Sequence, residues 1–293
     1  MEEIVYLNGS LIPASQARVS VFDHGFLYGY GLFETMRAYH GKIFLLERHL
    51  KRLMDSAEAI GLGAGLAGVN LVKACLDTLR ANRLEDARLR LTVSNGEVDA
   101  FPWAGISRTP TVVVTARSYT PFSAEKYQQG FKVGISSVRR CQQSLISRIK
   151  SANSLVSVLA RIEAVATGLD EALLLNDRGF IAEGGGSNVF LVKSSALLTP
   201  SLESGILPGI TRGVVIELAE ALGIVVNEGD VSLDDLKQCD EAFFTNSMIE
   251  IMPLVAVRDD TGQNITIGSG KPGEVTKRLK GAYRKRVEKE TMT

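Results

Sequence analysis

The sequence has few cysteines, no long apolar run and no excess of charge of either sign. Its three cysteines, Cys75, Cys141 and Cys239, are odd in number and widely scattered, which argues against a disulfide framework or a zinc site. No apolar run approaches the ~18 residues of a membrane span, and the first residues lack the basic and apolar regions of a signal peptide. We therefore expect a soluble, cytoplasmic protein that holds no metal.

The charge balance removes further classes of partner. Lys+Arg and Asp+Glu both number 33, so the chain offers no electrostatic footprint for nucleic acid or for an acidic membrane. The basic tail, 277–289, also carries Glu288 and is expected to be a solvated terminal helix. The histidines show no nucleophile–base arrangement, and Ser187 lies in no Gly-x-Ser-x-Gly elbow. His24 and His49 are therefore expected to be structural.

Hydrophobic periodicity and turn signals divide the chain into short elements. Asn8-Gly9, between two apolar runs, predicts a hairpin. The expected helices cover 46–61, 68–82, 151–168, 211–222 and 232–237. The expected strands cover 89–93, 111–115, 131–138, 171–176, 189–193, 224–228 and 242–245. The expected domains are a small α+β domain (1–118), a linker (119–124) that contains a Pro-Phe break, and a larger domain (125–293). The loop around Trp103 either lines a pocket or packs.

Two segments about thirty residues apart carry the chemistry. Lys150 follows Ile149 and precedes small residues, and partial desolvation there would free its amine for Schiff-base chemistry; the alternative is a surface lysine. Glu183 precedes three glycines, which favour a backbone that approaches something closely; the alternative is a carboxylate capping a turn. An amine and an anion together suit an aldehyde cofactor, pyridoxal 5'-phosphate (PLP).

Further residues have the chemistry of a phosphate site. The turn at Leu207-Pro208-Gly209 precedes a predicted helix, and the amides at a helix start attract anions; the alternative is a plain turn capped by Thr211. The Arg52 guanidinium matches phosphate oxygens bidentately. The Ser187 hydroxyl, beside exposed glycine amides, would complete an anion cradle.

Taken together, these segments resemble the class IV (fold type IV) PLP-dependent enzymes. That family includes branched-chain aminotransferases, D-amino acid aminotransferases and 4-amino-4-deoxychorismate lyases. The resemblance covers nearly the whole chain, and its ordered motifs are Asp23-His24-Gly25, Tyr28-Gly29-x-Gly31-x-Phe33-Glu34, His49-x-x-Arg52-Leu53, Lys150-x-x-Asn153, Asp170-Glu171-Ala172-Leu173-Leu174, Glu183-Gly184-x-x-Ser187-Asn188-Val189-Phe190, Gly209-Ile210-Thr211-Arg212, Thr245-Asn246-Ser247 and Glu250-Ile251-Met252-Pro253. It implies a small α+β domain, a larger pseudo-barrel domain and a homodimer with the active site near the interface.

The resemblance also implies residue roles. Lys150 corresponds to the Schiff-base lysine and proton shuttle, and Glu183 to the carboxylate beside the pyridine nitrogen. The implied cofactor-binding residues are Lys150, Arg52, Glu183, Ser187, Asn188, Leu207, Gly209, Ile210, Thr211, Asn246 and Ser247. The implied substrate contacts are Tyr28, Phe33, Arg90, Asn95, Asn246, Ser247 and Met248. Thr35 corresponds to a residue that aids proton transfer in the lyases.

The motifs do not all resemble enzymes that catalyse the same reaction. Two segments resemble the pocket of a branched-chain aminotransferase, which moves an amino group between an amino acid and a 2-keto acid: Tyr28-Gly29…Phe33-Glu34 and Ala87-Arg88-Leu89-Arg90. Thr35, where that enzyme usually has glycine, and Asn246 look more like the lyase, which forms 4-aminobenzoate and pyruvate. Asn95 stands where the lyase and the D-amino acid enzyme usually carry arginine. We therefore favour the branched-chain type, with the lyase as the alternative and the D-amino acid enzyme as a minor one. A non-catalytic relative would lack Lys150 or Glu183, and both are present.

Overall fold

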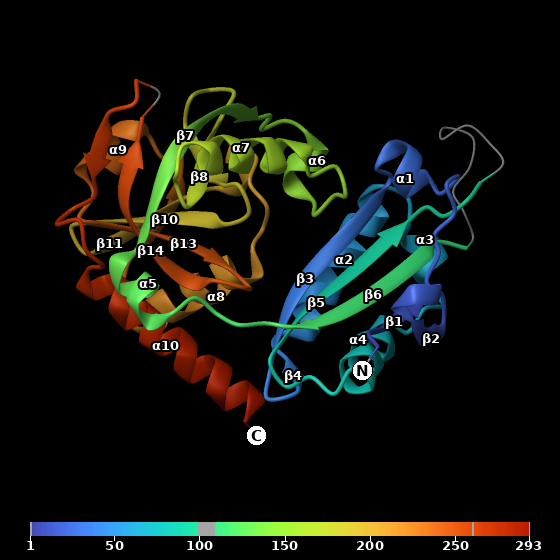
Figure 1. The fold of residues 1–293 in the computed structure, drawn as a ribbon. Helices are drawn as coiled ribbons and strands as arrows, with labels where there is room; N and C mark the ends of the chain where they lie inside the picture. Colours follow the sequence, from blue (N-terminus) through green and yellow to red (C-terminus); the bar gives the residue numbers. More distant parts are fainter. Residues whose placement is uncertain (1, 99–108, 260, 293) are drawn as a thin grey trace. The chain divides into compact units, whose positions relative to one another are not determined.

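Two β-sheets organise the computed structural model, which describes residues 2–98, 109–259 and 261–292. The chain divides into two compact units (Figure 1). The first comprises Met1–Thr120, Ile149–Asn153 and Val287–Thr293, and the second comprises Pro121–Arg148 and Ser154–Arg286. Trp103, whose loop was expected either to line a pocket or to pack, lies outside the described residues. Among the helices of these ranges, none is long and apolar enough to cross a membrane.

The first unit is built on a six-stranded antiparallel sheet in the order β2-β1-β6-β5-β3-β4. Its strands are β1 (Ile4–Leu7), β2 (Ser10–Pro13), β3 (Gly31–Tyr39), β4 (Lys42–Ile43), β5 (Ala87–Ser94) and β6 (Thr111–Ser118). Its helices are α1 (His24–Tyr28), α2 (Leu46–Ala59), α3 (Gly63–Leu66) and α4 (Leu71–Ala81). The alternation of β3 buries Leu32 and Met36 in one cluster with Leu50 and Leu53 of α2. Phe33 and Thr35, at the alternate positions of β3, therefore face the other side of the sheet.

The second unit holds a nine-stranded sheet in which β14-β7, β7-β8 and β11-β12 are parallel pairs. Its strands are β7 (Phe131–Arg140), β8 (Glu171–Asn176), β9 (Ile181–Gly184), β10 (Asn188–Lys193), β11 (Ala196–Pro200), β12 (Val226–Gly229), β13 (Glu241–Asn246), β14 (Glu250–Arg258) and β15 (Asn264–Thr266). Its helices are α5 (Ala124–Gln129), α6 (Leu145–Arg148), α7 (Leu155–Ala166), α8 (Ile210–Ala221), α9 (Leu233–Gln238) and α10 (Glu274–Thr291), whose end is counted with the first unit. The curled sheet encloses a core that includes Val133, Leu173, Val189 and Phe244.

Most of the expected elements are present. The hairpin joins β1 to β2, with Asn8 at φ 47° and Gly9 at φ 97°, the left-handed values that a two-residue turn requires. The expected helices 46–61, 211–222 and 232–237 correspond to α2, α8 and α9, and every expected strand is found within a few residues of its predicted ends.

Two expectations about helices were wrong. The helix expected from 151 begins at Leu155, because Ser151 instead forms a bridge with Leu32 at the start of β3. The C-terminal helix is not simply solvated, because Leu279, Tyr283 and Val287 are buried along one side of it. In both places tertiary contacts, which local sequence does not report, decide the outcome.

Candidate active site

Lys150 belongs to the first unit, where it shares an aromatic ring with a second cation. Its Nζ lies 4.7 Å from the centre of the Phe33 ring, and the Arg90 Cζ lies 3.9 Å from the same centre. Both distances are inside the ~6 Å range of cation–π attraction. Phe33 and Arg90 thus form an aromatic and cationic wall beside the Lys150 amine.

Backbone pairing holds the Lys150 segment against β3. The Phe33 amide donates to the Lys150 carbonyl over 2.9 Å, and the Ala152 amide donates to the Gly31 carbonyl over 2.8 Å. Asn153 Nδ2 adds a bond of 2.9 Å to the Gly29 carbonyl. Gly29 has φ 66°, and a Cβ there would lie 2.5 Å from Asn153 Oδ1. Only glycine suits this position, so α1 ends where the lysine segment docks.

A buried charge network lies behind Lys150. Arg52 Nε and Nη2 donate to Glu34 Oε1 and Oε2 over 2.8 Å and 2.6 Å, and His49 Nδ1 lies 2.7 Å from Glu34 Oε2. Burial acts to raise the pKa of Glu34, but the Arg52 charge and the two hydrogen-bond partners outweigh it and lower this pKa to about 2. Burial lowers the pKa of His49; the hydrogen bond and the charge of Glu34 act against it, and the charges of Arg52 and Lys150 act with it. The network therefore fixes the Arg52 guanidinium against the Glu34 carboxylate.

Three further residues of this unit, each with an expected role at the active site, differ in their exposure and in the contacts they make. Thr35 pairs with Arg90 in the β3–β5 register and so lies on the Phe33 face. Tyr28 is half exposed and meets the His24 ring edge-on. Asn95 is fully buried, and its Nδ2 lies 3.1 Å from His24 Nδ1. The Asn95 side chain is therefore part of the interior of the first unit and has no exposed surface there.

Glu183, one residue before the end of β9 in the second unit, is a buried carboxylate held by several donors. Its Oε1 lies 2.8 Å from Arg140 Nη2. Its Oε2 accepts from the Leu207 amide over 3.0 Å and from Asn188 Nδ2 over 3.3 Å. Asn188 Nδ2 also donates to the Leu207 carbonyl. Donors from three segments thus hold the carboxylate in one orientation.

The residues expected to hold phosphate in the second unit have unused polar groups. Helix α8 begins after Gly209 with no side-chain cap, so the first amides, at Ile210 and Thr211, lack the partner that a cap would supply. Ser187 Oγ and Thr245 Oγ1 are buried and have no hydrogen-bond partner within the described residues. Buried polar groups without partners are rare. A helix start and unsatisfied hydroxyls fit a phosphate group.

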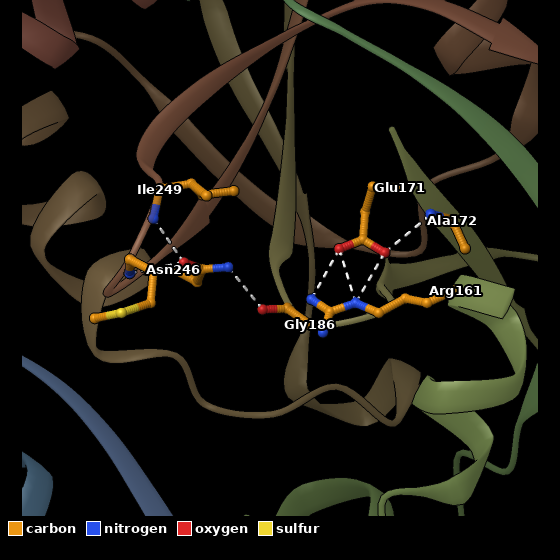
Figure 2. A network of polar contacts seen from close by, with 7 residues as sticks. Arg161, Glu171, Ala172, Gly186, Asn246 and Ile249 are labelled. Carbon is orange, nitrogen blue, oxygen red and sulfur yellow. Dashed lines mark hydrogen bonds and ion pairs between the residues drawn. The ribbon is translucent and has the colours of Figure 1, made fainter. Parts of the chain in front are cut away.

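The glycine loop after Glu183 lies between an arginine and an asparagine (Figure 2). Arg161 forms a bidentate ion pair with buried Glu171, with Nη2 2.9 Å from Oε2. A Cβ on Gly186 would meet the Arg161 guanidinium. From the other side, Asn246 Nδ2 donates to the Gly186 carbonyl over 2.9 Å, and its Oδ1 accepts from the Met248 and Ile249 amides. The loop backbone is thereby fixed on both sides.

The structure groups the expected residues by unit. The first unit holds Tyr28, Phe33, Thr35, Arg52, Arg90, Asn95 and Lys150, and the second holds Glu183, Ser187, Asn188, Leu207, Gly209, Ile210, Thr211, Asn246, Ser247 and Met248. Arg140 and Arg161 were not expected to take part. Each meets its carboxylate only through the folding of the second unit, and a lone arginine in a strand or helix gives no local signal of that contact.

Gly209 tests how tightly this half of the site is built. A Cβ there would lie 1.9 Å from Asn188 Oδ1, so Gly209→Ala must displace the side chain that bonds Glu183 and Leu207. We expect this variant to lose about 1–3 kcal/mol in urea unfolding. Gly213→Ala, one turn later with open space around its Cβ, is the matched control and should gain up to about 1 kcal/mol. Equal stability of the two variants would contradict this interpretation.

The fold and the two groups of residues described above are those of a known enzyme family. Residues 31–257 match the family described as Amino-transferase class IV. The chain belongs to this family, as its motifs predict, and is therefore a PLP-dependent enzyme. Its architecture, a small antiparallel sheet unit and a curled half-barrel unit, is the expected α+β fold type IV.

Relatives with different reactions match nearly the whole chain. A Methanocaldococcus jannaschii protein, provisionally named a branched-chain-amino-acid aminotransferase, is 41% identical over 281 residues, 96% of this chain and 95% of the relative. The aminodeoxychorismate lyase of Bacillus subtilis is 34% identical over 97% of this chain and 95% of its own length. The D-alanine aminotransferase of Bacillus licheniformis is 33% identical over 98% of both.

Solved structures agree on the fold. The branched-chain amino acid aminotransferase of Escherichia coli superposes with a TM-score of 0.87 at 34% identity, over 99% of this chain and 96% of that chain. The branched-chain aminotransferase of the archaeon Thermoproteus uzoniensis, solved with norvaline, gives 0.88 at 32% identity, over 100% and 98%.

Proposed function

We propose that this class IV aminotransferase is of the branched-chain type and moves an amino group between a branched-chain amino acid and a 2-keto acid. The observation that carries this proposal is the Phe33 ring, 4.7 Å from Lys150 Nζ, because an aromatic surface beside the reactive amine suits an apolar side chain. The 41% identity to a relative provisionally named for the same activity supports it.

The residues present fit PLP, and we assign them as follows. PLP supplies an electron sink for a carbanion when it is bound. Lys150 Nζ would attach the cofactor and then carry the α-proton, since an amine held close to its target is an effective base. Arg52, the Ser187 hydroxyl, the start of α8 and the 246–247 turn would bind phosphate. Glu183 would hold its negative charge beside the ring nitrogen, with Asn188 and Leu207 beside it.

Glu183→Gln should lower kcat on the order of 100-fold or more, because a neutral amide cannot stabilise a protonated ring nitrogen as a carboxylate does. Steady-state kinetics with saturating PLP would measure the loss. Glu203→Gln, an exposed carboxylate of the same unit, is the control and should retain full activity. Unchanged kinetics in Glu183→Gln would refute the assigned role.

The substrate class is tested by measuring the turnover rate of the purified enzyme with three sets of substrates: L-leucine with 2-oxoglutarate, D-alanine with 2-oxoglutarate, and aminodeoxychorismate alone. We expect the first to be fastest. Release of 4-aminobenzoate far above the transamination rates would instead establish the lyase. Thr35 and Asn246 favour that second candidate, and the Bacillus subtilis lyase supports it at 34% identity. Fastest turnover of D-alanine would establish the minor alternative.

We also propose that the enzyme is a homodimer, as its resemblance to the family implies. Helix α7 exposes an apolar face in the second unit, formed by Leu155, Val158, Leu159, Ile162 and Val165. Apolar surface on this scale is typical of an interface. Sedimentation at micromolar concentration tests the dimer, and a monomer there would exclude it. The cytoplasmic location likewise stays a prediction.

A further inference from the structure

The turn from β13 to β14, residues 246–250, contains a buried glutamate in an unusual backbone conformation. Asn246 ends β13, Glu250 begins β14, and the two are partners in the strand register. Glu250 has φ 56°, a left-handed value that glycine adopts freely and a glutamate only at a cost in free energy. Its side chain is nevertheless fully buried. A residue held in a costly conformation indicates a function, and here the group available for it is the carboxylate.

Helix α10 supplies a cation to this carboxylate. Arg284 Nε donates to Glu250 Oε2 over 2.6 Å, and the Arg284 side chain is 45% exposed while that of Glu250 is 0% exposed. A buried carboxylate is costly unless it is paired, so a surface arginine stabilises an interior anion. The start of α10 is held separately, because Glu241 of β13 accepts from the Val275 and Thr276 amides over 3.0 Å and 2.8 Å. The helix is therefore attached to the β13–β14 hairpin at two points.

A second contact from α10 reaches the neighbouring residue of the turn. Lys280 Nζ lies 3.5 Å from the centre of the Tyr127 ring, within the range of cation–π attraction. The Tyr127 hydroxyl donates to the Ile249 carbonyl over 3.0 Å. Lys280 and Arg284 are four residues apart, so they lie on the same side of the helix, and both belong to the second unit. One side of α10 thus holds two consecutive residues of the turn, Ile249 through Tyr127 and Glu250 directly.

The same turn carries the residues assigned above to the phosphate. Asn246 Oδ1 accepts from the Met248 and Ile249 amides over 2.8 Å and 2.9 Å, and its Nδ2 donates to the Gly186 carbonyl (Figure 2). A displacement of the turn at Ile249 would therefore move Asn246 and, with it, the glycine loop that follows β9. The side chains that α10 holds are in this way coupled to Asn246 and Ser247, which would meet the phosphate.

We propose that Arg284 is a positioning residue for the phosphate end of the PLP site, acting through Glu250 on the 246–250 turn. The proposal rests on the assignment of residues 246–247 to the phosphate, and not on the choice among the three reactions. With Arg284 in place, the ion pair keeps Glu250 in its left-handed conformation, and the turn presents Asn246 and Ser247 in a fixed orientation. Without the guanidinium, Glu250 loses this partner, the turn relaxes and the phosphate is held less tightly. The cofactor is then released faster.

Release of PLP from the holoenzyme tests this role. Holoenzyme is diluted into cofactor-free buffer, and the loss of bound cofactor is followed by its absorption. In Arg284→Gln we expect release to be about tenfold faster, the usual size for the loss of a hydrogen bond to a charged group, and Arg284→Lys should restore part of the wild-type rate. Arg278→Gln, exposed on the same helix, is the matched control and should release PLP as wild type does. Wild-type release in Arg284→Gln, or an equal acceleration in Arg278→Gln, would overturn the proposal.

Glu250→Gly separates the carboxylate from the backbone conformation. Glycine is the residue that φ 56° favours, so a turn that needed only this conformation would retain PLP in the variant. We expect instead the fast release predicted for Arg284→Gln, because the ion pair is lost. The double variant should release PLP no faster than either single variant, since both remove one interaction. Wild-type retention of PLP in Glu250→Gly would contradict the proposal, and so would additive effects in the double variant.

Two measurements without substrate separate this role from stability and from the phosphate assignment. The phosphorus NMR resonance of bound PLP should shift in Arg284→Gln, whereas a general loss of stability leaves it in place; faster release with an unmoved resonance would overturn the proposal. Ser247→Asp adds a like charge to the turn and should accelerate release at least as much. Unchanged release there would remove the phosphate assignment and this proposal together. Fast release in Ser247→Asp with wild-type release in Arg284→Gln would remove only the role of Arg284, and neither outcome depends on which reaction the enzyme catalyses.

Discussion

Lys150→Ala is expected to abolish turnover, by a factor on the order of 10⁴ or more, while PLP still binds through its phosphate. The variant loses both the amine that attaches the cofactor and the base that carries the proton, and no other lysine lies in the 149–153 segment. The segment itself should stay in place, because its bonds to Gly31 and Phe33 come from the backbone. Initial rates and the cofactor retained after dialysis measure the two effects separately.

Lys51→Ala is the matched control for this variant. Lys51 lies on α2 with an exposed amine, paired to Asp55 one turn away, and its loss should leave activity and cofactor content unchanged. A Lys150→Ala protein that retains a tenth of the wild-type rate would contradict the assignment. A variant that binds no PLP at all would show that the phosphate contacts alone do not hold the cofactor.

Glu34→Gln is expected to destabilise the protein by about 3 kcal/mol at pH 7. The change leaves the buried Arg52 guanidinium without its anion, and an uncompensated buried charge is costly. The size agrees with the fall of the Glu34 pKa from its ordinary value of 4.5 to about 2, since each pKa unit is worth about 1.4 kcal/mol. Urea unfolding at pH 7 measures the difference.

The pH dependence gives this prediction a definite sign. A carboxyl with a lowered folded-state pKa stabilises the protein fully above the unfolded value, near 4.5, and loses that contribution as pH falls towards about 2. Wild type and Glu34→Gln should therefore differ most at neutral pH and converge in acid. Glu47→Gln, on the exposed side of α2, is the control and should follow wild type throughout. A gap that persists at pH 2 would assign the effect to packing.

Much of the fold could be predicted because its signals are local. The dipeptide Asn8-Gly9 favours a turn with left-handed φ values whatever surrounds it, and the leucines of α2 repeat at helical spacing. Ser232 caps α9 in a reciprocal pair with Asp235, which also depends on neighbours in sequence. The lysine and the carboxylate were identified by the same kind of evidence, as short motifs in a fixed order.

The rest depends on contacts between distant residues. Residues 151–153 carry a helical pattern but pair with β3, more than a hundred positions earlier in the chain. Arg140 meets Glu183 because β7, β8 and β9 lie side by side, and nothing near Arg140 in sequence indicates that. Asn95 was chosen by its place in a motif, whereas its burial follows from how β5 ends against His24.

The position of the Lys150 segment in the sequence also determines when, during synthesis, the first unit can be completed. The strands β1 to β6 of the first unit have all been synthesised once Ser118 is added, yet the edge that carries Lys150 is still unmade. That edge pairs with Leu32 only after β7 has emerged. Closing so long a loop is entropically costly and slow. A nascent chain halted between these points would therefore display a nearly complete sheet with no reactive amine.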